Sequence, residues 1–382
     1  MSPVAQITPR PAAGVFEGVV DEQRVLFNTR DRRLHVLNSS AASLWDALRH
    51  PTTVATIAAE LAHDYRVDAA TIRVEVERTL DRFVADGLAG ERRAAFVSAP
   101  VELPSRPASA AATTIAAMDT RIAIHLDGPM VVAAIAKATA ALRTESHPAD
   151  SWIALDEANG SWVVTSSLGT RARTGSRLAG VLRVISEINA VAVAGRPDHL
   201  VFHAGAVARN GRAVVLPGSS NRGKSTLTTG LVRAGYDYLT DEAAAVDTAG
   251  VVHPFAKAIA LDPGSFALFP ELTPEPENAV EKVMVSREWH VDPSRVGAVA
   301  AASPVAAIVC PSWRAGSTTR VARIRGTEAL HSLLGDAFDF TAGGPDVFSI
   351  LVDLAESVPV YRLRYSDLDE AIATVDRLLT SA

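Results

Sequence analysis

One short segment near the middle of the chain has residue types and spacing suited to holding a polyphosphate. Residues 218–225 read Gly-Ser-Ser-Asn-Arg-Gly-Lys-Ser, which matches the pattern G-x-x-x-x-G-K-[ST]. Glycines let such a backbone curl so that its N–H groups point at one phosphate, the lysine adds a compact charge, and the serine hydroxyl can bind Mg²⁺. We therefore expect a nucleotide at this phosphate loop, contacted by Gly218, Ser219, Ser220, Asn221, Arg222, Gly223, Lys224, Ser225 and Thr226.

Three further residues could act on a phosphate held by this loop. Asp241 and Glu242 directly follow the strand-like segment 236–240, and His203 ends the strand-like segment 200–203. Phosphoryl transfer to an alcohol needs an acidic residue to hold the metal and a base to accept the alcohol proton. Read alone, an Asp-Glu pair after a strand is more often a solvated turn, and a lone histidine is more often a core residue. The phosphate loop upstream favours the catalytic interpretation.

The elements that must position these residues alternate between strands and helices. Strand-like segments lie at 122–125, 152–155, 162–165, 200–203, 213–216, 236–240 and 305–310, and helix-like segments lie at 175–194, after 223 and at 367–379. This alternation predicts an α/β core with a central sheet over residues 121–382. The strand at 213–216 leads into the phosphate loop and a helix follows it, which is the context that such a loop requires.

Residues 14–90 read as a separate, smaller α+β domain of winged-helix size. Segments 15–20, 24–29 and 34–37 predict a three-stranded meander. Three helices follow it: the first two have capping residues at 38–40 and at 52–53, and the third starts near Asp68 and ends at Gly87. Residues 91–120 are rich in Ala, Pro and Ser without an apolar period, and we interpret them as a linker.

The composition excludes several classes of protein. The chain has 382 residues, 48% of them hydrophobic, and a formal net charge of −6, which argues against a general nucleic-acid binder. The single cysteine rules out a disulfide framework and favours a reducing compartment. No apolar run reaches the roughly 18 residues of a membrane span, and the N-terminus lacks the apolar core of a secretory signal. We expect a cytoplasmic protein without membrane contact, and the sequence leaves a homo-oligomer open.

The order and separation of these motifs resemble the nucleotide core of the HPr serine kinase/phosphorylase family. The similarity rests on segments 202–207, 213–225 and 238–242, and downstream on 254–261, 263–265 and 358–363. It covers roughly residues 121–382 and implies an α/β P-loop kinase domain that uses ATP and Mg²⁺.

The same resemblance implies a role for each candidate residue. Lys224 would hold the nucleotide phosphates and His203 would assist near the transferred phosphate. Ser225 and Glu242 would bind Mg²⁺, and Asp241 would be the base that accepts the proton of the attacking hydroxyl. The family usually has two aspartates at the acidic pair, whereas this chain has Asp-Glu.

The N-terminal domain is similar to the PqqD family, the peptide-recognition element of ribosomal peptide natural-product pathways. Segments 34–38, 53–58 and 84–88 and the helix with Trp45 carry this similarity. It implies that a leader peptide adds as an extra strand beside 34–37, in a groove against the third helix, where arginines 30, 32 and 33 could meet an acidic peptide. The alternative is a generic winged helix that binds DNA, but the third helix mixes arginines with acidic residues and offers no positive face.

Taken together, the motifs predict an ATP- and Mg²⁺-dependent kinase that phosphorylates a serine hydroxyl of a precursor peptide held by residues 14–90. A flexible linker would raise the local concentration of that peptide into the millimolar range. Two alternatives stay open. One is a kinase of free serine or another small molecule, and the other is a nucleotide-gated adaptor that binds the peptide without transferring phosphate.

Overall fold

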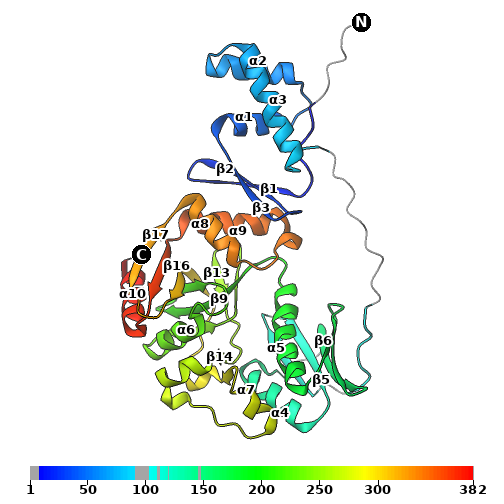
Figure 1. Ribbon diagram of the computed structural model, residues 1–382, viewed down its shortest axis with the longest axis vertical. Coiled ribbons are helices and arrows are strands. Elements are labelled where there is room, and N and C mark those ends of the chain that lie inside the picture. The colour runs from blue at the N-terminus through cyan, green and yellow to red at the C-terminus, as the bar shows by residue number, and fades with distance from the viewer. Residues whose placement is uncertain (1–7, 91–102, 110–111, 119, 145–147, 382) are drawn as a thin grey trace.

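A small N-terminal domain stands on a larger region that is built on two main sheets (Figure 1). The structure, a computed structural model, describes residues 8–90, 103–109, 112–118, 120–144 and 148–381. No helix among these residues combines the length and the apolar character that a membrane crossing requires.

The N-terminal domain has the predicted meander and the predicted helices. Its antiparallel strands lie in the order β1 (Val15–Val20), β2 (Gln23–Asn28), β3 (Arg33–Leu37), and its helices are α1 (Ser39–Ala47), α2 (Val54–Tyr65) and α3 (Ala69–Ala85). Each helix begins as its sequence predicts, because Asn38, Thr53 and Asp68 accept a hydrogen bond from a backbone N–H of the first turn.

Strand β2 is buried on both faces, which the expectation of a separate N-terminal domain did not include. Leu26 packs into the core shared with α1 and α3, while Val25 and Phe27 point to the other face. That face lies on helix α9 (Gly344–Ser357), where the Phe27 ring centroid is 5.6 Å from that of Phe348. Burying an aromatic or aliphatic side chain of this kind contributes about 2 kcal/mol. The N-terminal domain is therefore docked on the C-terminal region.

Polar contacts and a close backbone approach fix the same interface. The backbone N–H of Asp21 donates to Glu356 Oε2 at 3.0 Å, and Arg32 pairs with Asp339 at 3.1 Å. A Cβ at Gly18 would lie 2.7 Å from Val352, so a larger residue there would push the domain off α9.

The predicted linker at 91–120 is shorter than expected, because strand β4 (Thr113–Ala117) lies inside that range. Much of the rest of the range, residues 91–102, 110–111 and 119, lies outside the described residues. Strand β4 belongs to a five-stranded sheet of order β4-β5-β6-β7-β8, which the helices α4 (Pro129–Ala138) and α5 (Arg177–Ala194) cover. The other strands of this sheet are β5 (Thr120–Leu126), β6 (Ser151–Ala158), β7 (Ser161–Ser166) and β8 (Arg171–Thr174).

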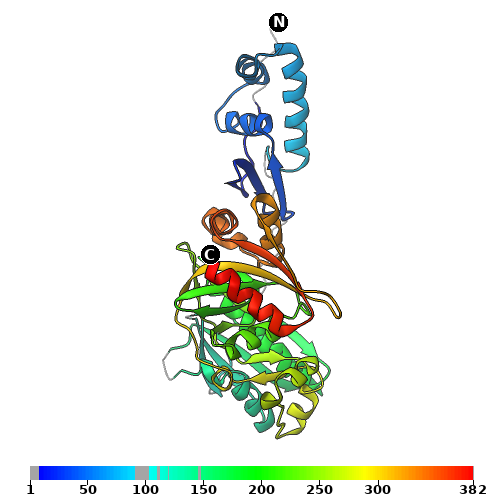
Figure 2. The same cartoon turned by 90° about the vertical axis from the view of Figure 1, so that its left-hand side faces the viewer.

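The second sheet has eight strands and carries the phosphate loop. Its order is β10-β9-β12-β13-β16-β18-β17, with β11 paired to β9, and β10 also pairs with β16 so that five strands form a closed ring of pairings. Helix α10 (Leu368–Ser381) lies across one face (Figure 2). The strands are β9 (Leu200–Arg209), β10 (Arg212–Pro217), β11 (Asp237–Thr240), β12 (Ala243–Val246), β13 (Val251–His253), β16 (Ser303–Trp313), β17 (Arg320–Ile324) and β18 (Val360–Tyr365).

Three further helices and a two-stranded sheet belong to this region. Helix α6 (Lys224–Arg233) follows the phosphate loop, and α8 (Gly326–Asp336) leads towards α9. The short helix α7 (Ala279–Met284) and the two-stranded sheet of β14 (Ile259–Leu261) and β15 (Trp289–Val291) lie below the loop-bearing sheet in Figure 1.

A hairpin brings His203 to the phosphate loop. The expectation that His203 ends its strand is wrong, because β9 continues to Arg209 and turns back into β10 at Asn210-Gly211, both with positive φ. In this register Ala204 lies opposite Pro217, and the Gly218 N–H donates to the His203 carbonyl at 3.2 Å. The histidine therefore lies beside the start of the loop although 15 residues, 203 to 218, separate them in the chain.

Candidate active site

The phosphate loop joins β10 to α6, as its sequence predicts. Gly223 precedes the first residue of α6 with φ 84°, and a Cβ there would lie 2.5 Å from the Tyr365 hydroxyl, so the position requires glycine. Lys224 is buried, and its Nζ lies 3.1 Å from the Ser219 carbonyl oxygen and 3.0 Å from His203 Nε2. The loop thus curls around the lysine at a helix N-terminus, an arrangement that suits an anion.

Thr226 and Arg222, like Lys224, have side-chain partners within the protein. The Thr226 hydroxyl lies 2.7 Å from that of Ser265, in a short 3₁₀ helix outside the phosphate loop. Arg222 donates from Nε to Ser219 Oγ at 3.3 Å. The structure thus gives the Thr226 hydroxyl a structural partner, whereas Ser219, Ser220 and Asn221 are exposed.

Asp241 follows β11 directly and is closed off from solvent. Its side chain has an exposed fraction of 0%. The Ser225 hydroxyl donates to its Oδ2 at 3.3 Å and the Ala260 N–H donates to the same oxygen at 2.9 Å. The Tyr238 hydroxyl donates to its Oδ1 at 3.0 Å. These donors hold the carboxylate against the loop serine.

Glu242, the next residue, faces open space. Its side chain is 28% exposed, and it lines a cavity of about 550 Å³, which we call the Glu242 cavity. His203 Nδ1 lies 3.2 Å from the Glu242 carbonyl oxygen, its hydrogen-bond partner, and 3.5 Å from Glu242 Oε1. Burial first, and the Lys224 charge second, lower the pKa of His203, so its ring is neutral at pH 7. A neutral ring with its proton on Nδ1 can donate to Glu242 and accept from Lys224.

Lys257 places a second buried ammonium beside the acidic pair. Its Nζ lies 3.6 Å from Asp241 Oδ1 and 3.8 Å from Glu242 Oε2. Burial lowers the pKa of Lys257, but the two carboxylates outweigh it and raise the pKa above its usual value. Burial lowers the pKa of Lys224 below its usual value. The acidic pair therefore has two buried lysines near it: the pKa of Lys257 is raised, whereas the pKa of Lys224 is lowered.

The oxygen atoms around the loop suit Mg²⁺. Ser225 Oγ and Asp241 Oδ2 lie 3.3 Å apart, and Glu242 is adjacent in the chain. Hydroxyl and carboxylate oxygens are the ligands that Mg²⁺ prefers, usually together with waters and substrate phosphates. These residues therefore fit a magnesium ion that accompanies a nucleotide.

A second cavity, of about 560 Å³, adjoins the loop from the side of β16 and β18, and we call it the arginine cavity. Its lining includes Gly218 and Ser219 of the loop and five arginines: Arg222, Arg314, Arg320, Arg362 and Arg364. Within the described part of the chain, Arg362 pairs with Glu328, and the other four have no ion pair. This concentration of positive charge suits a polyanion.

Asp336 is a residue that sequence reasoning missed. It ends α8 and lines the arginine cavity. Burial raises the pKa of its carboxyl group, opposed by the charges of Lys224, His203 and Arg222. A single aspartate at a helix end carries no sequence signal of this neighbourhood, which only the packing of α8 on the sheet creates.

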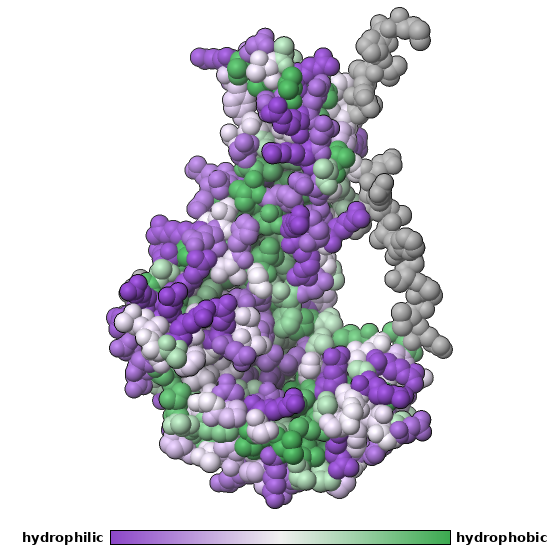
Figure 3. Space-filling view, in the orientation of Figure 1, coloured by the Kyte–Doolittle hydropathy of each residue, from purple (hydrophilic) through white to green (hydrophobic). Residues whose placement is uncertain are grey.

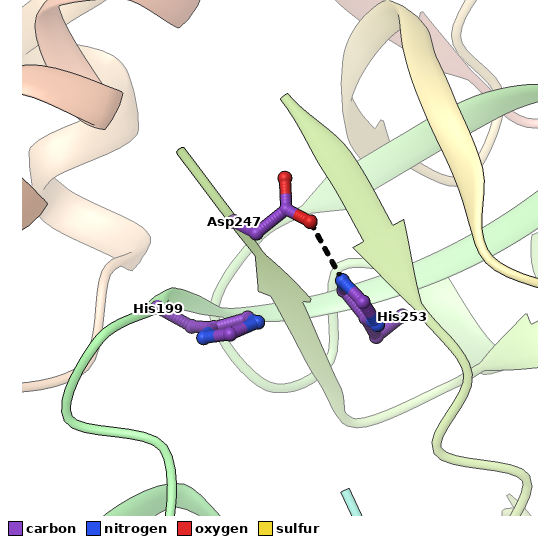
Figure 4. Close-up of side chains that lie close together, drawn as sticks. All are labelled: His199, Asp247 and His253. Atoms are coloured by element: carbon purple, nitrogen blue, oxygen red, sulfur yellow. Dashed lines mark hydrogen bonds and ion pairs between the residues drawn. The ribbon is translucent and has the colours of Figure 1, made fainter. Parts of the chain in front are cut away.

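A separate group of potential metal ligands lies away from the phosphate loop. His199, Asp247 and His253 gather where β9, β12 and β13 meet, with ligand atoms within 4.8 Å of one another, and Asp247 Oδ2 lies 2.9 Å from His253 Nε2 (Figure 4). His199 Nδ1 lies 2.9 Å from a carboxylate oxygen of Asp198, and its Nε2 faces the guanidinium of Arg196. Because His199 Nε2 already faces the Arg196 guanidinium and Asp247 already pairs with His253, we interpret the group as structural.

A groove in the N-terminal domain runs between β3 and α3. Its volume is about 680 Å³, and its walls include His35, Val36 and Leu37 of β3 and Ile72, Val76, Thr79 and Phe83 of α3. Among the described residues β3 is an edge strand, so its outer N–H and C=O groups can pair with an added strand. Of the arginines expected to meet a peptide, Arg32 and Arg33 pair with acidic side chains instead, Asp339 and Asp31.

Comparison with known families bears on the same groove. Residues 23–89 match the family model described as Coenzyme PQQ synthesis protein D (PqqD). The matched range contains β2, β3 and α1 to α3, and therefore both walls of the groove. The chain thus contains a PqqD-like domain, as the sequence predicted. No curated protein matches the chain.

Proposed function

We propose that the chain is an ATP- and Mg²⁺-dependent kinase that phosphorylates a hydroxyl group of a precursor peptide bound by its N-terminal domain. The observation that carries the proposal is the convergence of Lys224, the Ser225–Asp241 pair and Glu242 at one loop. A phosphate-binding loop, oxygen ligands for Mg²⁺ and a solvent-accessible carboxylate are the parts that phosphoryl transfer needs. The resemblance of residues 121–382 to the HPr kinase/phosphorylase family supports the same chemistry.

On the donor side, Lys224 and the loop amides hold the phosphates of ATP, and the arginine cavity adds positive charge beside them. When bound, Mg²⁺ supplies further charge neutralisation at the phosphates. Because Lys224 is held at its Nζ by His203 and Ser219, its ammonium is already in place before the nucleotide arrives.

Burial and hydrogen bonding lead us to exchange the roles that the sequence assigned to the acidic pair. A general base must come within about 2.6–3.2 Å of the hydroxyl that it deprotonates. Asp241 is closed off and already accepts from Ser225, Ala260 and Tyr238, whereas Glu242 lines an open cavity. We therefore assign Asp241 to the Mg²⁺ site and Glu242 to the base.

In the proposed reaction the substrate oxygen attacks the γ-phosphorus of ATP while its proton passes to Glu242. The bond to the β-phosphate oxygen breaks, and ADP leaves. The His203 side chain orients Glu242 and Lys224 through its two ring nitrogens, as a positioning residue between donor and acceptor.

The PqqD-like domain supports a peptide as the acceptor, from a pathway that modifies ribosomally synthesised peptides. A leader segment would add to β3 as a fourth strand, in the groove against α3. Main-chain hydrogen bonds to the strand edge would supply affinity, and the pockets between side chains would supply specificity.

The test is to incubate the full chain with ATP, Mg²⁺ and candidate precursor peptides from the same genome, and to measure the intact mass of each peptide. We expect one added phosphate, and none with Lys224→Ala. Nucleotide binding without a phosphopeptide would instead support the adaptor. Turnover of free serine without a phosphopeptide would support the small-molecule kinase, and either outcome would overturn the proposal.

A further inference from the structure

The Glu242 cavity lies between α5 and the segment 337–343, which connects α8 to α9. Most of its lining is apolar and comes from α5, β9 and that segment: Ala190, Val193, Ala194, Val201, Phe338, Phe340 and Ala342. The surface is hollowed between the lobe that carries α5 and the region below the N-terminal domain (Figure 3). A cavity of about 550 Å³ is far larger than one serine requires.

The inner end of this cavity reaches the reacting groups. Glu242 is part of the lining, and the Phe338 ring stands edge-on to the His203 ring with centroids 6.1 Å apart. Phe338 is itself held in place, because its N–H donates to the Val201 carbonyl at 2.8 Å. A hydroxyl group that enters the cavity therefore meets the carboxylate beside a fixed aromatic wall.

A polar atom of α5 in the lining lacks a hydrogen-bond partner. Asn189 Oδ1 is buried and has no hydrogen-bond partner among the described residues. Leaving a buried acceptor unpaired costs about 1–3 kcal/mol. The Asn189 side chain is only half-buried, and a turn of its amide towards the cavity would let Oδ1 accept from a backbone N–H of an extended peptide, which favours a peptide over a purely apolar occupant.

The outer end of the cavity touches the N-terminal domain. Asp339 of the lining pairs with Arg32, the residue before β3, at 3.1 Å. Phe340 of the lining packs on Phe27, with ring centroids 5.2 Å apart. A peptide strand that pairs antiparallel with β3 has its C-terminal end beside Arg32. The peptide residues that follow this strand therefore arrive at the cavity mouth.

We propose, on the basis of the proposed function, that the Glu242 cavity binds the peptide segment that follows the leader, with an apolar side chain next to the acceptor hydroxyl. The occupant is one continuous peptide that pairs with β3 and then enters between α5 and 337–343. Its apolar side chain packs on Phe338 and Val193, and its backbone donates to Asn189.

The test fills the cavity without touching the reacting groups. Ala190 is exposed on α5, and Ala190→Trp places a large side chain in the cavity mouth; Ala373→Trp, at an exposed position of α10, is the matched control. We expect Ala190→Trp to lower kcat/KM for the peptide by about tenfold or more. The Kd values for ATP and for the isolated leader segment stay within about twofold of wild type, and the control behaves as wild type. Wild-type kcat/KM in Ala190→Trp would overturn the cavity assignment and leave the kinase proposal standing.

A second measurement separates the two proposals if wild type forms no phosphopeptide. Hydrogen exchange of the full chain is compared with and without the same peptide. Slower exchange in 186–194 and 338–343 would uphold the cavity as a peptide site while the kinase proposal falls. Unchanged exchange in both segments would overturn the cavity assignment as well.

Discussion

The two cavities that flank the phosphate loop are nearly equal in volume, about 560 and 550 Å³, but opposite in chemistry. The arginine cavity gathers five guanidinium groups, whereas the Glu242 cavity is mainly apolar, with a carboxylate at its inner end. Lys224 contacts Ser219 of the first cavity, and His203, which contacts Lys224, lies 3.5 Å from Glu242 of the second. This difference shows that the two cavities suit different ligands: the arginine cavity favours a polyanion, and the Glu242 cavity favours an uncharged group.

The strongest way to break this comparison is to exchange the acidic residues for their amides. Glu242→Gln removes the proposed base, so transfer to the peptide falls by about 10²–10⁴-fold while ATP affinity is retained. Asp241→Asn weakens Mg²⁺-dependent ATP binding. Rates of phosphopeptide formation and calorimetric ATP affinities check both. If Asp241→Asn keeps ATP affinity but loses transfer, and Glu242→Gln keeps the rate, the roles return to those expected from the sequence.

The next effect concerns the pH dependence of stability that arises from His290, which is buried near Lys257. Burial first, and the Lys257 charge second, lower the pKa of His290 to about 3. The unfolded chain binds a proton at this residue below pH about 6.5 and the folded chain does not. Above about pH 6.5, His290 is neutral in both states and does not change the free energy of unfolding. As the pH falls from there towards 3, the free energy of unfolding decreases by about 1.4 kcal/mol per pH unit.

We expect His290→Leu to flatten the decline of the unfolding free energy between pH 6 and pH 4, as measured by urea denaturation. Glu288, whose pKa is raised by burial, opposes the trend, and because its carboxylate lies 3.4 Å from His290 Nε2 the comparison reports on the two residues together. His331→Leu, at an exposed histidine of α8, is the control. Parallel pH profiles of wild type and His290→Leu would contradict the buried, neutral histidine.

The smallest expected effect concerns the arginine cavity, on the side where we propose that ATP binds. Arg314→Gln and Arg364→Gln each remove one unpaired charge from the arginine cavity. We expect each to raise the KM for ATP about tenfold, in line with about 1.5 kcal/mol for a charge-assisted hydrogen bond, without changing the Kd for the peptide. Arg323→Gln, at an exposed position of β17 outside the cavity, is the control. An unchanged KM in both cavity variants would remove the arginines from nucleotide binding.

Local signals in the sequence predicted much of the fold. Capping residues and apolar periods located α1, α2, α3 and the meander, and the pattern at 218–225 located the phosphate loop between a strand and a helix. The same local reasoning ended β9 six residues early, because Ala204, Gly205 and Ala206 have weak strand propensity. The hairpin that carries His203 to the loop was therefore not predicted.

Features assembled from distant parts of the chain escaped prediction. The arginine cavity joins residues from 222 to 364 through the pairings of β16, β18 and β17, and no local pattern links them. The docking of the N-terminal domain did leave a signal. Val25-Leu26-Phe27 is an unbroken apolar run, which is typical of a strand that is covered on both faces. Its partner helix, α9, lies more than 300 residues away in the chain.

The double burial of β2 has a consequence for how such proteins can be inherited and engineered. A recognition cassette that is joined only by a tether could be exchanged freely between enzymes to change peptide specificity. Here, separating residues 8–90 from the rest of the chain would expose Phe16, Val25 and Phe27 on the separated domain. Such an exposed apolar sheet face promotes aggregation. A functional chimera must therefore carry the contact residues of α9 along with the donor cassette, so that specificity and docking travel together.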